Sequence, residues 1–258
     1  MFDSHCHLDF AEFDAARNEH LAAARRAGVT DWFVPGCAPE QWPSVGALAA
    51  VPGVHCGYGI HPWWAEGVSD LDETLVALRR QLLESRAVAL GECGLDGLRA
   101  AEVPMARQIE VFEAQLQLGR ELGLPLVLHQ VRAREDFLRA LDRVGLSSPG
   151  AVVHGFAGDA TWARALIGRG LFFGVGPALL RRGRERLRQA VTQIPLERLL
   201  VETDAPDQGL GGQRGVPLDL VAVVDALARL RGQDAAVVGS TTAENARGFL
   251  RVRPVAGA

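Results

Sequence analysis

The residues of this sequence that could do chemistry are histidines and carboxylates that directly follow short apolar runs. His5 and His7 stand in the stretch DSHCHLD, and Glu202 and Asp204 stand in LLVETDAP. Side chains two positions apart on an extended chain point to the same face, so each pair can reach one common ligand. Four more residues of these types end other apolar runs: His61 in GIHP, Glu92 in GECGLD, His129 in LVLHQ and His154 in VVHG.

Imidazole and carboxylate groups gathered in one place form a donor set suited to Zn²⁺, Mn²⁺ or Mg²⁺. One such histidine is more often a hydrogen-bonded structural residue, but such residues at the ends of six independent runs favour a metal site. Four histidines and two carboxylates at one mouth exceed a single tetrahedral site and can hold two ions about 3.5–4 Å apart, bridged by a carboxylate. All 27 basic residues are arginine. Because no lysine can serve as a carboxylated bridge, Glu92 is the expected bridging ligand, and the expected cofactors are two divalent metal ions.

Such a site predicts hydrolysis by a water that the metals activate for attack on phosphorus or on a carbonyl carbon. Asp204 is the candidate general base, with pure metal ligation as the alternative. His61 is a candidate contact to a substrate oxygen, with a supporting role behind the ligands as the alternative. We expect Glu202 to orient a ligand imidazole and Asp96 to cap a helix.

The elements that must position these residues are apolar runs that alternate with amphipathic stretches. Eight short runs read as strands, over residues 2–4, 31–34, 54–59, 87–90, 126–128, 151–153, 171–175 and 199–201. Helical patterns cover roughly 11–27, 70–85, 105–116, 132–144, 159–169, 178–193, 217–231 and 235–250. Eight strand–helix repeats predict an α/β protein with the (β/α)8 TIM-barrel fold; the alternative is an open doubly wound sheet. A barrel would bring all the donors to one mouth.

The composition is that of an ordinary globular protein. The chain has 258 residues, 48% of them hydrophobic and 22% charged, with a net charge of −4. This balance excludes a disordered chain and a global positive field that would attract polyanions. No linker rich in proline or serine divides the pattern, so we expect one domain over residues 1–258. Four widely spaced cysteines and the lack of a signal peptide or membrane span predict a cytoplasmic protein with reduced thiols and no membrane partner. The protein is expected to be a monomer, although no feature of the sequence specifies its oligomeric state.

Six motifs, in this order and spacing, resemble those of the TatD family of metal-dependent hydrolases: DSHCHLD, GIHP, GECGLD, PLVLH, HGFAGD and LLVETDAP. The resemblance covers the chain from about residue 3 to residue 250. It implies a (β/α)8 barrel, a two-metal site and deoxyribonuclease activity. The resemblance implies that His5, His7 and Asp204 bind one metal ion and that His129 and His154 bind the other. Glu92 would bridge the two ions. The family pattern also contains Gln108, Phe112 and Gln115, which read most simply as packing residues.

Three departures from the family pattern lie near the expected substrate. Trp63 and Trp64 stand where the family often continues GxHP with a histidine. Val131 replaces a usual arginine, and Arg132 beside it would point to the opposite side of a continuing strand. The loop after the eighth run usually carries an asparagine before its proline, whereas here it reads QGLGGQRGVP and ends at Pro217. Trp63 and Trp64 are candidates for stacking on a base, with shielding of the pocket from solvent as the alternative. Arg214 is a candidate phosphate contact in a mobile loop at the mouth, and Arg132 is a further candidate contact to the substrate.

A further candidate for phosphate contacts is the basic stretch 181–188, which holds five arginines. Arg181, Arg184 and Arg188 would share one face of a helix, and the alternative is the solvated outside of a barrel helix.

The sequence thus favours a two-metal hydrolase that is a 3′-to-5′ deoxyribonuclease, with DNA as its partner. Two alternatives remain: hydrolysis of a small amide, ester or phosphoester on the same metals, and a metal-binding protein without turnover.

Overall fold

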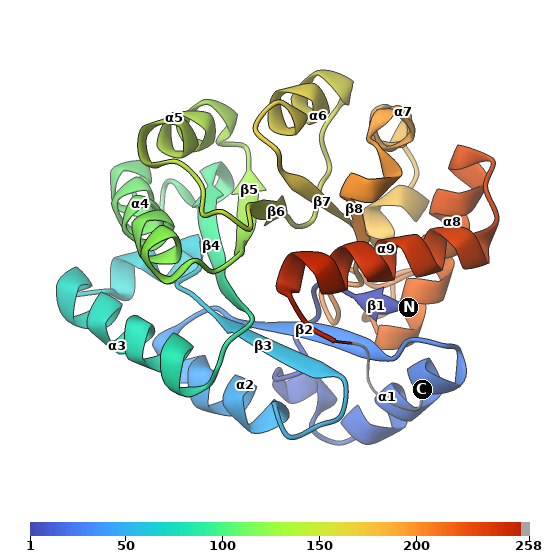
Figure 1. The fold of residues 1–258 in the computed structure, drawn as a ribbon, viewed down its shortest axis with the longest axis horizontal. Helices are drawn as coiled ribbons and strands as arrows, with labels where there is room; N and C mark the ends of the chain where they lie inside the picture. The colour runs from blue at the N-terminus through green and yellow to red at the C-terminus, as the bar shows by residue number, and fades with distance from the viewer. Residues whose placement is uncertain (254–258) are drawn as a thin grey trace. The chain divides into compact units, whose positions relative to one another are not determined.

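The computed structural model of the chain describes residues 1–253 (Figure 1). The contacts among Cα atoms divide the chain into two compact units. Unit 1 comprises Met1–Val34, Ala50–Val54 and the chain from His154 onward; unit 2 comprises Pro35–Ala49 and His55–Val153. Unit 1 is therefore assembled from segments that are distant in the sequence.

Eight parallel strands form one sheet in the order β1-β2-β3-β4-β5-β6-β7-β8. Their bounds are β1 Phe2–Asp3, β2 Asp31–Gly36, β3 Val54–Tyr58, β4 Ala89–Asp96, β5 Leu126–Val131, β6 Ala151–Val153, β7 Phe172–Val175 and β8 Leu199–Val201. All eight predicted runs are strands. In unit 1 the chain after β1 lies beside β8, because the Ser4 N–H donates to the Val201 carbonyl at 2.9 Å. The strands alternate with helices, as the (β/α)8 prediction requires.

The helices are α1 Arg17–Arg26, α2 Trp42–Leu48, α3 Leu71–Glu84, α4 Met105–Leu122, α5 Arg134–Val144, α6 Ala160–Ile167, α7 Glu185–Gln193, α8 Leu220–Arg231 and α9 Ala235–Leu250. The helix α2 was not predicted; it is short and carries Pro43 at its start. The predicted start of α7, at residue 178, is too early. Residues 181–184 precede the helix, so Arg181, Arg184 and Arg188 do not share one helix face. No helix within residues 1–253 has the length and apolar character needed to cross a membrane.

Each unit has its own apolar packing around the strands. In unit 2, α4 and α5 lie side by side outside β4 and β5 (Figure 1). Between these helices the rings of Phe112 and Phe137 stack with their centroids 5.5 Å apart. In unit 1, Phe156 and Phe173 meet edge to face at 5.0 Å. These four side chains are almost fully buried. Burying side chains of this size stabilises each unit by roughly 2–3 kcal/mol per residue and fixes the strands whose ends carry the polar residues.

Candidate metal centre

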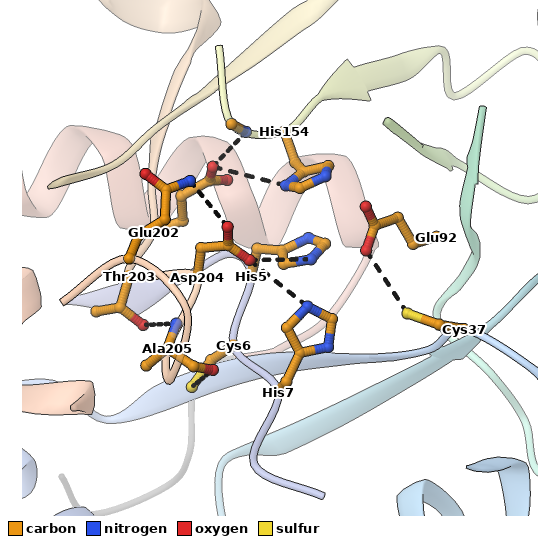
Figure 2. A network of polar contacts seen from close by, with 12 residues as sticks. His5, Cys6, His7, Cys37, Glu92, His154, Glu202, Thr203, Asp204 and Ala205 are labelled. Carbon is orange, nitrogen blue, oxygen red and sulfur yellow. Dashed lines mark hydrogen bonds and ion pairs between the residues drawn. The ribbon is translucent and has the colours of Figure 1, made fainter. Parts of the chain in front are cut away.

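In unit 1, two histidines and one carboxylate come together beyond the carboxyl ends of β1 and β8 (Figure 2). The His5 and His7 Nε2 atoms lie 3.8 and 3.5 Å from Asp204 Oδ1. Each of the three residues is at most 9% exposed. Burial alone would raise the pKa of Asp204, but the hydrogen bond from His7 and the imidazoles of His154 and His5 hold it well below its ordinary value. A buried, ionised carboxylate among imidazoles is a donor set that fits a divalent cation.

Backbone pairing explains how these three residues meet. The strand β1 ends at Asp3, before the histidines, yet the chain goes on pairing with the segment that follows β8. The Asp204 N–H donates to the His5 carbonyl at 2.9 Å, and the His7 N–H donates to the Ala205 carbonyl at 2.8 Å. Asp204 itself has a left-handed backbone with φ of 52°. This conformation is uncommon for a residue with a side chain and is frequent at functional sites.

His154 and Glu202 extend this cluster within unit 1. The rings of His5 and His154 stack at 3.9 Å. Glu202 Oε1 accepts the Gly155 N–H at 2.5 Å and lies 3.9 Å from His154 Nδ1. Burial raises the pKa of Glu202 to about 8. A Cβ on Gly174 would lie 2.0 Å from Glu202 Oε2, so only glycine leaves room for this carboxylate beside β7.

In unit 2, the carboxylate of Glu92 lies between two histidines. Glu92 Oε1 is 2.9 Å from His129 Nδ1 and 3.3 Å from His61 Nε2. The strands β4 and β5 are longer than predicted, so Glu92 and His129 lie within strands. Glycine allows their close pairing, because a Cβ on Gly94 would lie 2.0 Å from the His129 carbonyl oxygen. His61, Glu92 and His129 form another group of described residues that could hold a metal ion, because their ligand atoms lie within 4.8 Å of one another.

Asp96 fixes the imidazole of His129 from its other side. Its Oδ2 lies 3.4 Å from His129 Nε2, and its Oδ1 accepts the Leu98 N–H at 2.9 Å, which confirms the predicted cap. Burial would raise the pKa of Asp96, but hydrogen bonds from His129 and Trp63 outweigh it and lower the pKa to about 2. The ionised carboxylate favours the His129 tautomer that is protonated on Nε2. The Nδ1 lone pair then faces Glu92, an arrangement that requires a cation or a proton between them.

Two buried glutamines of α4 hold the segments on which Asp96 and His61 lie. Gln108 Oε1 accepts the Asp96 N–H at 2.7 Å, and Gln108 Nε2 donates to the Asp96 carbonyl at 3.1 Å. Gln115 pairs in the same way with Ile60, at 2.7 and 2.9 Å. Their interpretation as simple packing residues is therefore wrong. Their amides replace ladder hydrogen bonds that the backbone of residues 60 and 96 would otherwise lack, whereas Phe112 packs as predicted.

Replacing Gln115 by leucine should lower the free energy of unfolding by about 2–4 kcal/mol, because both backbone groups of Ile60 would stay buried without a partner. Urea unfolding followed by circular dichroism measures the change. Gln117→Leu is the matched control. Gln117 lies two positions after Gln115 on α4, but it is exposed and its side-chain amide donates to Glu121 on the surface. An equal loss of stability in both variants would contradict the assigned role of Gln115.

The three residues predicted to contact the substrate, Trp63, Arg132 and Arg214, have different surroundings. Trp63 is 43% exposed and its indole N–H donates to Asp96 Oδ2 at 2.7 Å. Arg132 is exposed and has a left-handed backbone with φ of 47°, so β5 does not continue through it and the orientation expected for a continuing strand does not apply. Arg214 pairs with Glu12 Oε1 at 2.6 Å.

Sequence reasoning missed two neighbours of the candidate ligands. Gln208 Nε2 donates to Asp204 Oδ2 at 2.8 Å. The Cys37 thiol donates to Glu92 Oε2 at 3.6 Å (Figure 2). Only the fold brings Cys37 to Glu92, 55 positions away, whereas the spacing of Gln208 four residues after Asp204 was a signal that could have been used.

The family of the chain follows from comparison with known proteins. The family model described as TatD related DNase matches residues 2–251. The chain belongs to the TatD family. This TatD-family chain is 38% identical over 262 residues to the 3′-5′ ssDNA/RNA exonuclease TatD of Cronobacter sakazakii, covering 97% of the chain and 98% of that protein. It is 35% identical over 220 residues to the uncharacterized metal-dependent hydrolase YjjV of Escherichia coli, covering 84% and 83%.

Solved structures of the family have the same fold. The crystal structure of the Escherichia coli TatD homologue YjjV matches with a TM-score of 0.91 and 31% identity, covering 98% of both chains. A TatD-family hydrolase from Entamoeba histolytica matches with a TM-score of 0.85 at 18% identity, which shows the fold alone. The predicted (β/α)8 barrel, the family and the hydrolase class are thereby confirmed.

Proposed function

We propose that this TatD-family hydrolase is a divalent-metal-dependent exonuclease that shortens single-stranded DNA from its 3′ end. The observation that carries the proposal is the complete donor set: every position that the family motifs give to a metal ligand holds a histidine, aspartate or glutamate. The proposal also draws on the printed activity of the relative from Cronobacter sakazakii, a 3′-5′ exonuclease of single-stranded DNA and RNA.

The donor chemistry fits two divalent ions, Zn²⁺, Mg²⁺ or Mn²⁺. By motif correspondence, His5, His7 and Asp204 would hold one ion, His129 and His154 the other, and Glu92 both. In each unit the buried carboxylate faces imidazole nitrogens, and the ionised Asp96 leaves the Nδ1 lone pair of His129 available. When bound, such ions acidify a water and neutralise charge on a phosphate.

The residues of the chain then orient and transfer protons. Asp204 stays ionised and, with its Oδ2 held by Gln208, would accept the proton of the attacking water. His61 Nδ1 accepts the Trp63 N–H at 3.2 Å, so its protonated Nε2 points at Glu92. This supports the alternative role predicted for His61, which is to position Glu92. Glu202, held by the Gly155 N–H, would orient His154.

We propose further that residues 1–258 form one domain, to which both units contribute strands, and that it works as a monomer. The four cysteines are buried thiols that form no disulfide, which supports a reducing compartment, the cytoplasm.

The proposed activity is tested with a single-stranded DNA oligonucleotide labelled at its 5′ end, incubated with the protein and Mg²⁺ or Mn²⁺. We expect a ladder that shortens from the 3′ end, and no ladder with EDTA or with Asp204→Asn. The same oligonucleotide labelled at its 3′ end should release labelled mononucleotide from the first time point. Intact DNA after incubation with metal-loaded protein would overturn the nuclease assignment and leave small esters and amides as substrates.

The arginines before α7 provide a test of contact with the phosphate backbone. Arg182 and Arg184 are exposed in the loop that follows β7. Because the strands are parallel, this loop lies at the same end of unit 1 as His5, His7 and Asp204. Each phosphate contact on a single strand contributes about 0.7 to the slope of log K against log salt, so R182Q/R184Q should lower the slope by about 1.4.

Fluorescence anisotropy at several salt concentrations measures this slope with EDTA present. The control is R26Q/R229Q, which removes two exposed arginines at the carboxyl ends of α1 and α8 and should leave the slope unchanged. Equal slopes for the test variant and the wild type would contradict a role of this loop in binding.

A further inference from the structure

Trp63 is exposed although it is held firmly in place. It lies in the short helix Pro62–Gly67 of unit 2 and is the only aromatic residue among the exposed large apolar side chains of residues 1–253. An indole of structural importance is normally buried, and leaving 43% of it in water forgoes hydrophobic stabilisation. Its exposure therefore needs another explanation.

Three side chains fix the orientation of this indole. Its N–H donates to Asp96 Oδ2 at 2.7 Å, and that carboxylate is only 3% exposed. The Arg99 guanidinium lies 4.6 Å from the ring centroid, and the Trp64 ring lies 6.1 Å away at an angle of 30°. A short hydrogen bond to a buried, ionised acceptor is of the strong, charge-assisted kind. The ring is thus preorganised, which lowers the entropic cost of binding a ligand on its exposed surface.

The same contacts connect Trp63 to the candidate metal ligands through two routes. Through its backbone N–H, Trp63 reaches His61 Nδ1 at 3.2 Å, and His61 Nε2 lies 3.3 Å from Glu92 Oε1. Through its indole N–H, it reaches Asp96, whose Oδ2 lies 3.4 Å from His129 Nε2. The two routes meet at Glu92, because His129 Nδ1 lies 2.9 Å from the same Glu92 oxygen. A group stacked on Trp63 is therefore located by the residues that also orient Glu92.

We propose that Trp63 is a specificity-determining residue that stacks on a nucleobase at the 3′ end of the single-stranded substrate. This inference rests on the proposed function and adds the part of the substrate that is recognised. Stacking suits all four bases, because each base has a π face. Replacing the aromatic residue that stacks on a base costs about 1–3 kcal/mol of binding free energy, which is roughly a 5- to 150-fold change in affinity. The enzyme should accordingly distinguish a 3′-terminal nucleotide from a 3′-terminal sugar phosphate that lacks its base.

The test compares two oligothymidylates of equal length, one intact and one with an abasic tetrahydrofuran residue at its 3′ end. Binding is measured with EDTA present, by quenching of tryptophan fluorescence and by anisotropy. We expect the wild type to bind the intact strand about tenfold more tightly. Trp63→Leu should bind both strands with the affinity that the wild type shows for the abasic one. Trp63→Phe, which keeps an aromatic ring, should restore part of the preference.

Leu98→Ala is the matched control, since Leu98 is 58% exposed and follows the Asp96 cap without contributing a ring. It should keep the full preference and the melting temperature of the wild type. Trp63→Leu and Trp63→Phe both lose the hydrogen bond to Asp96, so both should melt at a similarly lowered temperature, and only the stacking preference should separate them. If Trp63→Leu retains the tenfold preference, or if the wild type cleaves DNA but binds both strands equally, the inference is wrong while the nuclease stands. If the wild type prefers the intact strand but cleaves neither, the inference holds and the exonuclease proposal fails. If it neither binds nor cleaves either strand, both fail.

Discussion

Glu92→Gln should lower the rate of DNA hydrolysis by about a thousandfold, the upper end of the roughly 10²- to 10³-fold loss found when one preorganised hydrogen-bond donor is removed from a reacting centre. Glu92 lies 2.9 Å from His129 and 3.3 Å from His61, so these two imidazoles converge on its carboxylate. An amide keeps the shape of the side chain but loses the negative charge, and it cannot neutralise two cations. We therefore expect Glu92→Gln to lose the proposed carboxylate bridge between the two metal ions.

Metal content separates this explanation from a fold defect. The wild type, dialysed against Mn²⁺ and analysed by plasma mass spectrometry, should carry two ions per chain, and Glu92→Gln should carry one or fewer. Saturating Mn²⁺ should raise the melting temperature of the wild type more than that of the variant, since ligand binding stabilises by about 2.7 kcal/mol at a hundred times the dissociation constant. Glu84→Gln, an exposed carboxylate on α3, is the control. Unchanged metal content with normal turnover in Glu92→Gln would remove Glu92 from the site.

Asp204→Asn should lower the catalytic rate constant by about 10³- to 10⁴-fold, at the upper end of what a general base contributes. The carboxylate faces His5 and His7 with one oxygen and is held by Gln208 through the other. Asparagine can retain a hydrogen bond to Gln208, so the fold should persist. It cannot accept a proton, and it is a weaker cation ligand.

Single-turnover rates with excess enzyme measure the chemical step directly. Asp225→Asn, a partly buried carboxylate on α8, should leave this rate unchanged. Gln208→Ala should lower it by a smaller factor, about tenfold, because it removes only the group that orients Asp204. A rate within threefold of the wild type for Asp204→Asn would show that Asp204 neither transfers the proton nor holds a required ion.

Much of the fold and of the donor set could be predicted from the sequence. Apolar runs of three to six residues that alternate with amphipathic stretches identify all eight strands, since this periodicity follows directly from which faces must be buried. Histidine and carboxylate positions such as His5, His7 and Asp204 were found because polar groups directly after an apolar run have no structural need to be there. The six ordered motifs were sufficient to indicate the family, which the comparison over residues 2–251 confirmed.

Other features depend on contacts between distant residues and only the tertiary structure decided them. Spacing suggested that His5 and His7 share a face of a strand, but β1 ends at Asp3, and pairing with the chain after β8 is what aligns them with Asp204. Gln108 and Gln115 look like packing residues on a helix, because no local pattern reveals that the backbone at Asp96 and Ile60 needs their amides. The linkage of Trp63 to Asp96, 33 positions apart, is likewise invisible in the sequence. Local periodicity records burial, whereas the partners of a buried polar group are set by how the chain packs, and for this protein that packing determines what each candidate residue can do.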